Sequence, residues 1–239
     1  QINLAIAGIA IGTVLLPKLS KYVQSKDQKK IIFIQNKALE LSLFLSLPAT
    51  LALLIAPEEI TSSLFGYGSF DNLSVKKSAE ALFYFALGLP AFSFIKIFSS
   101  FLFARNNTKT PFYFSLFSVI VNIIIIVYFF SEIGFIIIPI ATTISSWLNS
   151  LLLLFFLIKK NYFSLNLNLI KPIFKILFST IFASIIFYFL IIFFENNLSY
   201  ESEFKLLTII MLVIVTFIVY ILISILTKAF KISDIKLKY

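Results

Sequence analysis

Long runs of apolar residues alternate with short polar stretches along the whole chain. The apolar runs fall at residues 2–17, 31–56, 79–104, 110–131, 135–158, 172–194 and 205–228. Apart from the shorter first run, each can form a helix that crosses the roughly 30 Å hydrocarbon core of a bilayer. Strand-like alternation is absent, and backbone in lipid must satisfy its own hydrogen bonds. The pattern therefore predicts an all-α integral membrane protein, a polytopic bundle of seven helices.

The first apolar run, residues 2–17, has neither the basic start nor the cleavage site of a signal peptide. It is also short for a membrane-spanning helix. We therefore expect an incomplete first helix and an N-terminal portion that precedes Gln1.

Basic residues are concentrated in every second connection between the runs. They are Lys18, Lys21, Lys26, Lys29 and Lys30, then Arg105 and Lys109, then Lys159, Lys160 and Lys171, and in the tail Lys228, Lys231, Lys236 and Lys238. The other connections, at 57–78, 132–134 and 195–204, contain only Lys76 and Lys77. Since basic loops mark the cytoplasmic side, the pattern predicts a cytoplasmic C-terminus.

Composition narrows the class of protein further. Hydrophobic residues make up 60% of the chain and charged residues 13%, which leaves a water-soluble fold no place for 30 Phe side chains. The chain contains no Cys or His, which excludes disulfides, thiolate or imidazole catalysis, and zinc or haem sites built on those ligands. The net charge is +9, but the basic residues lie in short loops and form no continuous stripe that could bind nucleic acid. No phosphate-binding loop or enzyme-like cluster is present, so we expect no cofactor and no enzymatic activity.

The connection at 57–78 is the longest between two apolar runs. Residues 60–65 suit a short interfacial helix, and the glycines in 66–70 favour a turn. Tyr67 and Phe70 would then lie at headgroup level as aromatic anchors.

Three prolines, Pro48, Pro90 and Pro139, fall inside apolar runs. Proline removes a helical donor, and interrupted helices often line the substrate path of transporters. Membrane helices also tolerate proline without a functional reason, so kink or gating roles and simple tolerance both remain open.

Several charged or amide side chains also fall inside the runs. Lys96 lies about 12 Å along the helix from the cytoplasmic end of the run 79–104. Its side chain either faces a hydrated cavity or extends to the lipid headgroups. Lys37 and Glu40 share a helix face, as a structural ion pair or as part of a cavity. Asn149 is a further cavity candidate, although Asn in a bundle more often bonds across helices.

Several short motifs resemble the MurJ (MviN) family of lipid II flippases, in the multidrug/oligosaccharidyl-lipid/polysaccharide exporter superfamily. They are the A-x-G-T-x-L-L-P-x-L-S segment at 10–20, L-P-A at 47–49, the F-x-x-G-x-F-like loop at 64–70, L-G-L-P-A at 87–91 followed by Lys96, the turn at 103–111 and W-x-N at 147–149. Their order and positions at helix boundaries make the resemblance specific over about residues 4–158. Where the family has Asp in the turn, this chain has Asn107.

The resemblance implies that the chain is the C-terminal part of a fourteen-helix flippase for the polyprenyl-linked peptidoglycan precursor. Residues 1–158 would be the C-terminal lobe, and 159–239 a cytoplasmic loop, the last two helices and a basic tail. The two lobes would enclose a cationic cavity for the pyrophosphate headgroup, and the last helices a groove for the polyprenyl tail. Transport would proceed by alternating access in the bacterial cytoplasmic membrane, with a coupling ion or membrane potential unspecified.

Other functions stay open on the residues alone. A related polysaccharide-lipid exporter or a cation-coupled drug antiporter would share the helical pattern. A membrane transferase would require an acidic or His cluster at one interface, which the sequence lacks, and a purely structural subunit would leave Lys96 and the prolines without a role.

Overall fold

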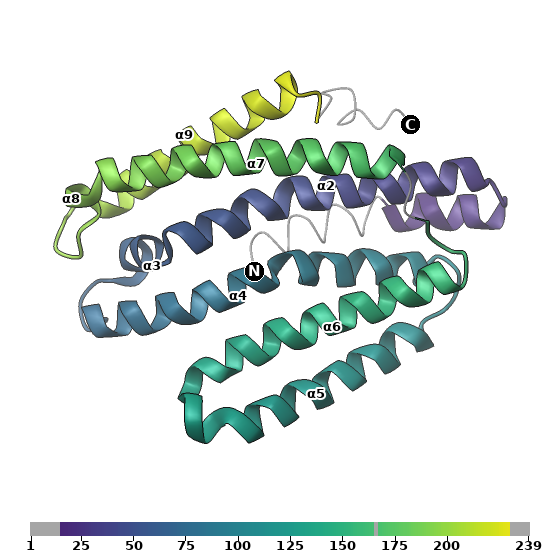
Figure 1. Cartoon of the computed structure of the whole chain (residues 1–239), viewed down its shortest axis with the longest axis horizontal. Helices are drawn as coiled ribbons and strands as arrows, with labels where there is room; N and C mark the ends of the chain where they lie inside the picture. Colours follow the sequence, from purple (N-terminus) through teal and green to yellow (C-terminus); the bar gives the residue numbers. More distant parts are fainter. Residues whose placement is uncertain (1–14, 165–166, 230–239) are drawn as a thin grey trace. The chain divides into compact units, whose positions relative to one another are not determined.

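The computed structural model describes residues 15–164 and 167–229, and all regular secondary structure in these ranges is helical. Residues 15–24 form a helix. The following elements are α2 (Gln28–Ile55), α3 (Pro57–Phe65), α4 (Asn72–Phe103), α5 (Lys109–Ile133), the 3₁₀ helix η1 (Gly134–Ile136), α6 (Ile137–Lys159), α7 (Leu167–Phe193), α8 (Glu195–Leu198) and α9 (Lys205–Leu226) (Figure 1).

The helices confirm the expected spans wherever the structure describes them. Among the described residues, five segments are long and apolar enough to cross a membrane, and one of them, Lys109–Lys159, contains both α5 and α6. Each predicted run from 31–56 onward corresponds to one long helix. Most of the run 2–17 lies outside the described residues.

Two predicted connections are wrong in detail, because helices extend beyond the apolar runs. Most of the expected loop 18–30 is helical, with a turn only at 25–27. The expected loop 132–134 is the end of α5 and the start of η1. Lys and Gln are good helix formers, and their polar ends can reach water while the backbone stays helical. An apolar run therefore indicates the part of a helix that lies in the membrane, and the helix itself can continue beyond it.

The expected short helix and turn after α2 are both present. α3 begins at Pro57, which suits the first helical position, and has Glu58 and Glu59 in its first turn. The turn that follows has Gly68 at φ 60°, a conformation that glycine adopts without steric cost.

Side-chain caps fix where three helices begin. Asp27 Oδ1 accepts a hydrogen bond from the backbone N–H of Lys30, and Asp71 Oδ1 from that of Ser74. The backbone N–H of Lys30 lowers the pKa of Asp27, and the side chain and then the backbone N–H of Ser74 lower the pKa of Asp71, because these hydrogen bonds stabilise the ionised form. Asn107 Oδ1 accepts from Thr110 N–H in the same way, so an amide performs the capping that a carboxylate would perform there.

The chain divides into two compact units. The predicted division at residue 158, between the C-terminal lobe and the last two helices, stays a prediction. The first unit, the α5–α6 unit, contains the described residues of Gln1–Ser46 and Leu87–Ile170. The second, the α3–α9 unit, contains those of Leu47–Ala86 and Lys171–Tyr239. Residues distant in sequence pack together in each unit, and α2 and α4 contribute to both.

In the α5–α6 unit, α5 and α6 form an antiparallel hairpin through η1 (Figure 1). A cluster of aromatic rings packs the second half of α4 against the segment after α6. Phe98 and Phe101 lie with ring centroids 6.3 and 6.0 Å from Phe163, and Phe94 contacts Trp147 edge to face at 6.3 Å. Such aromatic pairs contribute beyond their buried area.

In the α3–α9 unit, the core forms where α7, α8 and α9 meet the α2–α3 junction. Its buried members are Ala56, Phe187, Ile191, Leu198, Ile209 and Leu212. Because Ala56 is fully buried and lies between α2 and α3, this core holds the short helix α3 against α9.

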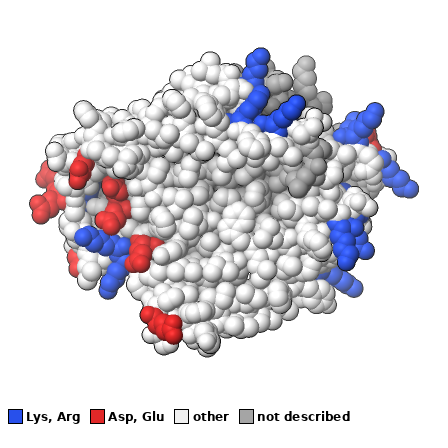
Figure 2. Space-filling view, viewed as in Figure 1, with Lys and Arg blue, Asp and Glu red and all other residues white. Residues whose placement is uncertain are grey.

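The outward surfaces of α5, α7 and α9 carry large apolar side chains and few charges. Val127 is 74% exposed, Phe193 80% and Leu226 80%. The face drawn in Figure 2 is correspondingly uncharged along the helices. Apolar surfaces of this extent suit lipid or a protein partner and not water.

Several helices end in the same tight C-terminal turn without a glycine. Lys26, Asn106, Asn161 and Lys228 have φ between 55° and 57°. In each case the next residue donates its N–H five residues back, as from Asp27 to the carbonyl of Tyr22 at 3.1 Å. This is the Schellman motif, whose left-handed position normally holds glycine.

Lys26→Gly should therefore stabilise the complete protein by about 0.5 kcal/mol, because it removes left-handed strain from a side chain that does not favour it. Thermal unfolding in detergent measures the change. Lys29→Gly, two residues into α2, is the matched control and should destabilise by about 0.5–1 kcal/mol. Equal effects of the two substitutions would contradict the strain argument.

Candidate functional site

α2 carries several polar side chains that are buried. Gln35, Glu40, Ser42 and Ser46 are each less than a tenth exposed. Buried polar groups are costly unless they are hydrogen-bonded. The Gln35 amide donates to the backbone carbonyl of Tyr162 at 2.9 Å, which ties α2 to the segment after α6.

The spacing of Lys37 and Glu40 predicted that they could pair, and the structure confirms this. Lys37 Nζ lies 2.6 Å from Glu40 Oε2. Glu40 is buried and Lys37 is partly exposed, so the ion pair lowers the cost of burying the carboxylate. A role for the pair in a substrate cavity stays a prediction.

Lys96 lies in the second half of α4 with an exposed side chain, next to the fully buried Ile97. Its backbone carbonyl accepts a hydrogen bond from Ser100 Oγ at 2.8 Å. A lysine exposed on a membrane-spanning helix faces water, protein or headgroups, because lipid tails would not solvate it. A cavity-facing Lys96 therefore stays a prediction with a direct test.

Asn149 and Asn122 connect α5 with α6. The Asn149 amide donates to Ser115 Oγ at 3.2 Å, and Asn122 donates to Thr142 and Ser145 at 3.3 and 3.2 Å. This is the cross-helix use that is commonest for Asn in bundles. The amide N–H of Asn149 is thus engaged between helices, and ligand contact by this residue stays a prediction.

Pro48 and Pro90 lie within α2 and α4, close to the boundaries between the two compact units. The division crosses α2 between Ser46 and Leu47 and α4 between Ala86 and Leu87. Proline weakens the helical hydrogen bonds of the turn before it. Both long helices are therefore locally weakened where they pass from one unit to the other.

Pro139 is placed differently from the expectation. It is the third residue of α6, directly after η1, and not in a helix interior. The first turn of a helix has no intrahelical acceptors for its N–H groups, so proline interrupts nothing there. Its position does not favour the predicted kink.

The turn of α4 before Pro90 is supported by α6. The indole N–H of Trp147 donates to the carbonyl of Leu87 at 3.0 Å. A Cβ on Gly88 would lie 2.9 Å from Thr143 Oγ1 and 3.0 Å from the Phe92 ring, so a larger residue would require these side chains to shift where α4 approaches α6. Trp147 and Gly88 thus have a structural reason to accompany Pro90 in the sequence motifs.

The turn between α4 and α5 is organised by Arg105. Its guanidinium donates to the carbonyls of Phe101 at 2.7 Å and Tyr162 at 3.1 Å, and lies 4.6 Å from the Tyr162 ring centroid. Burial lowers the pKa of Arg105, and the charge is stabilised by carbonyl dipoles and the ring. Lys109 begins α5 with an exposed side chain. The sequence indicated the basic residues of this turn, but it gave no sign of Tyr162, the partner of Arg105.

Lys205 was missed because it lies at the first position of an apolar run. It is 2% exposed, and its ammonium donates to the carbonyls of Gly66 at 2.7 Å and Tyr200 at 2.6 Å. Its Nζ also lies 4.5 Å from the ring centroids of both Tyr67 and Tyr200. Lys205 therefore fixes the turn after α3 and the loop after α8 to the start of α9.

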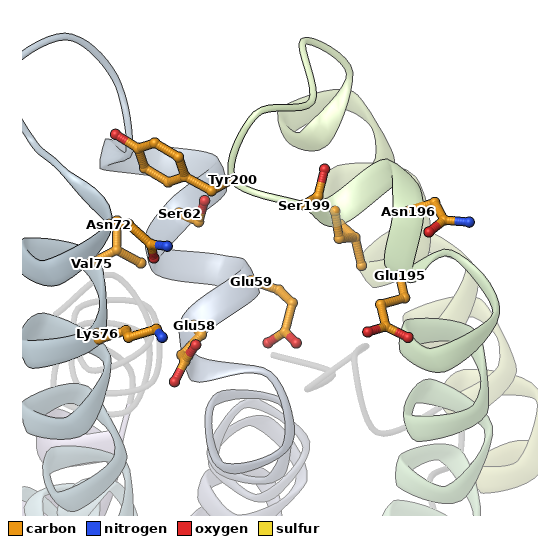
Figure 3. A pocket seen from close by; sticks show the side chains of 11 residues that line it. Glu58, Glu59, Ser62, Asn72, Val75, Lys76, Glu195, Asn196, Ser199 and Tyr200 are labelled. Atoms are coloured by element: carbon orange, nitrogen blue, oxygen red, sulfur yellow. The ribbon is translucent and has the colours of Figure 1, made fainter.

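A cavity of about 320 Å³ opens beside this lysine, between α3, the start of α4 and α8. We call it the α3–α8 cavity. Glu58 and Glu59 enter it from α3 and Glu195 from α8, with Lys76 and Tyr200 at its wall (Figure 3). Burial raises the pKa of Glu59, and the charges of Glu58 and Glu195 raise it further.

The helices and their apolar surfaces define the class: a multi-pass, all-helical membrane protein. Residues 1–209 match the family model described as Lipid II flippase MurJ. The chain belongs to the MurJ lipid II flippase family.

Individual relatives agree with this assignment. A probable lipid II flippase MurJ of Rhizobium meliloti (strain 1021) is 36% identical over 173 residues, which are 72% of this chain and 32% of the relative. One of Rickettsia prowazekii (strain Madrid E) is 38% identical over 149 residues, 62% of this chain and 29% of the relative. The chain thus spans about a third of the length of these curated relatives.

A solved structure supports the fold. The chain resembles a lipid II flippase MurJ in an inward closed conformation with a TM-score of 0.74 and 24% identity. The match covers 95% of this chain and 44% of that one. The helical arrangement therefore matches part of the fold of that structure.

Lys96→Cys in an otherwise Cys-free version of the complete protein should react with a membrane-impermeant maleimide, because a hydrated cavity ionises and exposes the thiol. Labelling of intact cells and inverted vesicles measures this. Ile120→Cys on the exposed apolar face of α5 is the matched control and should stay unlabelled. Absence of labelling at residue 96 from both sides would contradict a cavity position.

Lys205→Met should destabilise the complete protein by about 2 kcal/mol, since two charge-assisted hydrogen bonds and two ring contacts are lost. Chemical unfolding in detergent measures the change. Lys77→Met is the control on the same unit, because Lys77 is exposed. A difference below about 0.5 kcal/mol between the variants would show that Lys205 does not hold the loops.

Proposed function

We propose that the complete protein moves lipid II from the inner to the outer leaflet of the bacterial cytoplasmic membrane. The match of residues 1–209 to the lipid II flippase family carries this proposal. The work is transport by alternating access and not catalysis, so no cofactor is required. The partners are the polyprenyl-pyrophosphate-linked glycopeptide and the surrounding lipids, together with a further lobe of the same protein.

Charged side chains in the spans support a role for this chain in handling an anionic headgroup. Lys96 and the Lys37–Glu40 pair lie in the α5–α6 unit. Placing charge in a membrane helix costs about 2.5–3.5 kcal/mol on insertion scales, so these residues are expected to serve a hydrated path. In the proposal, Lys96 lines the cavity and attracts the pyrophosphate.

The prolines support a route for alternating access. Because Pro48 and Pro90 lie where α2 and α4 pass between compact units, each helix is able to bend there at low cost. The proposed motion changes the angle between the two parts of these helices, and Trp147 and Gly88 keep the α4 turn attached to α6. Access then alternates while the packing within each unit is retained.

The exposed apolar surfaces of α7 and α9 support binding of the polyprenyl chain. Phe174, Phe178 and Ile181 on α7 are each more than half exposed, and so are Leu207 and Ile214 on α9. In the proposal, the tail stays against these helices within the bilayer while the headgroup crosses. The C-terminus is cytoplasmic in this arrangement, as the basic loops predict.

Replacing the wild-type gene with a Lys96→Ala variant should slow the appearance of lipid II on the outer leaflet about tenfold, because one charge-assisted contact to the pyrophosphate is lost. Lys96→Arg keeps the charge and should retain most of the rate. Accessibility of lipid II to an externally added, lipid II-binding reagent measures both.

Lys77→Ala is the control, since Lys77 is exposed in the first turns of α4 and precedes the apolar run 79–104. If Lys96→Ala and Lys96→Arg transport equally, Lys96 has no role in binding the headgroup. If cells depleted of the wild-type protein display lipid II at the normal rate, the proposed function itself is wrong.

A further inference from the structure

The end of the α3–α9 unit where α7 begins and α9 ends carries positive charge that no described carboxylate of the unit balances. Lys171 and Lys175 lie in the first three turns of α7, Lys228 follows α9, and all three side chains are exposed. The described carboxylates of this unit belong to α3, the start of α4, α8 and the loop before α9. On the face drawn in Figure 2, basic side chains lie near the end of α9, and acidic ones gather at the α8 end.

Hydrogen bonds place these lysines close to one another. Ser179 Oγ donates to the carbonyl of Lys175 at 2.9 Å and lies 3.3 Å from Thr227 Oγ1 at the end of α9. Since Lys228 directly follows Thr227, Lys175 and Lys228 start from neighbouring turns of α7 and α9. Lys171 precedes Lys175 by four residues, which places both on one face of α7.

This arrangement of lysines is unfavourable without an anion. Two like charges four residues apart on a helix repel each other. Lys175 also lies inside the apolar run 172–194, where lipid tails would not solvate an ammonium group. A lysine in such a position extends its long side chain towards the headgroups. An anionic headgroup next to these lysines would offset both the repulsion and the poor solvation.

The same face of α7 continues as an apolar surface towards the middle of the membrane. Phe178 and Phe182 follow Lys171 by seven and eleven residues, which is close to two and three helical turns. Their side chains are 60% and 48% exposed. Phe182 lies about 10 Å along the helix from Lys175, within half of a hydrocarbon core roughly 30 Å thick. One side of α7 thus presents cations at headgroup depth and rings at acyl-chain depth.

We propose that this face, which we call the α7 lipid surface, binds an anionic phospholipid of the adjoining leaflet, such as phosphatidylglycerol. Its phosphate accepts hydrogen bonds from Lys171 and Lys175, with Lys228 adding charge from the neighbouring helix. One acyl chain lies against Phe178 and Phe182. In the predicted orientation this is the inner leaflet.

Charge and shape together favour a phospholipid over other occupants of the α7 lipid surface. A soluble anion would use the lysines and leave the two rings uncovered. A zwitterionic lipid would bring a second cation to a site that already has three. The bound phospholipid is not the transported lipid, so the proposal does not depend on the flippase function. Phe178 also belongs to the surface proposed for the polyprenyl chain, and the two lipids would exclude each other at this ring.

The first experiment maps lipid contacts of the complete protein in phosphatidylcholine nanodiscs. A trace of phosphatidylglycerol with a diazirine in its acyl chain is crosslinked by light, and the labelled peptides are identified by mass spectrometry. Label on the α7 peptide, relative to label on the exposed apolar face of α5, should be at least about fivefold higher than with the matching phosphatidylcholine probe. Added salt should reduce this preference, because it screens the lysines.

The second experiment varies the cations. Lys171→Gln and Lys175→Gln should each lower the phosphatidylglycerol preference about fivefold, since each lysine near a membrane surface contributes a similar share of the attraction. Lys171→Arg and Lys175→Arg should retain it. The control is the pair Lys76→Gln and Lys77→Gln, two exposed lysines of the same unit in the first turns of α4. It should leave the preference unchanged.

Unfolding midpoints in phosphatidylcholine alone show that each variant folds. They should not fall for Lys175→Gln, because the repulsion between Lys171 and Lys175 is removed. Equal labelling of α7 by the two probes would overturn the proposal. So would a preference that both Gln variants keep, or one that the control pair also loses. Displacement of the probe by equimolar polyprenyl pyrophosphate would assign the lysines to the transported lipid instead.

Discussion

Polar groups in an apolar environment must find a partner, and this requirement accounts for most of what is specific in the structure. The backbone meets it by forming helices. The helix ends meet it with Asp27, Asp71 and Asn107 at the starts and with left-handed turns at the ends. Side chains meet it across helices, as Asn122 and Asn149 do between α5 and α6. Apolar contacts make up most of the packing, but lipid tails offer a helix the same contacts. Hydrogen bonds between polar groups therefore determine which helices associate.

The same requirement explains how the chain uses its cations. Lys37 is paired with a carboxylate in its own helix, whereas Arg105 and Lys205 are held by backbone carbonyls and tyrosine rings. Carbonyl dipoles and ring faces stabilise a cation without adding a second charge that would also need desolvation. Each of these two residues fastens a connection between helices, which keeps the ends of the long helices fixed.

The long helices α2 and α4 each contain a proline close to the point where they pass from one compact unit to the other. Each unit has its own aromatic or aliphatic core, and the helices change unit beside Pro48 and Pro90. Packed cores resist small deformations, while a helix with missing hydrogen bonds bends at lower cost. This combination is what the proposed alternating access requires, because each unit can then keep its internal contacts while the helices bend.

The sequence alone determined the helical class, the position of nearly every span, the Lys37–Glu40 pair and the family. These depend on hydropathy and on spacing within one helix, which are local properties. The partners of Arg105, the role of Lys205 and the meeting of Glu59 with Glu195 were decided only by tertiary structure, because they join segments more than fifty residues apart. The position of Pro139 within its helix was likewise decided only by the fold. An apolar run gives no sign of where one helix stops and the next begins, and only the fold placed this proline in a first turn.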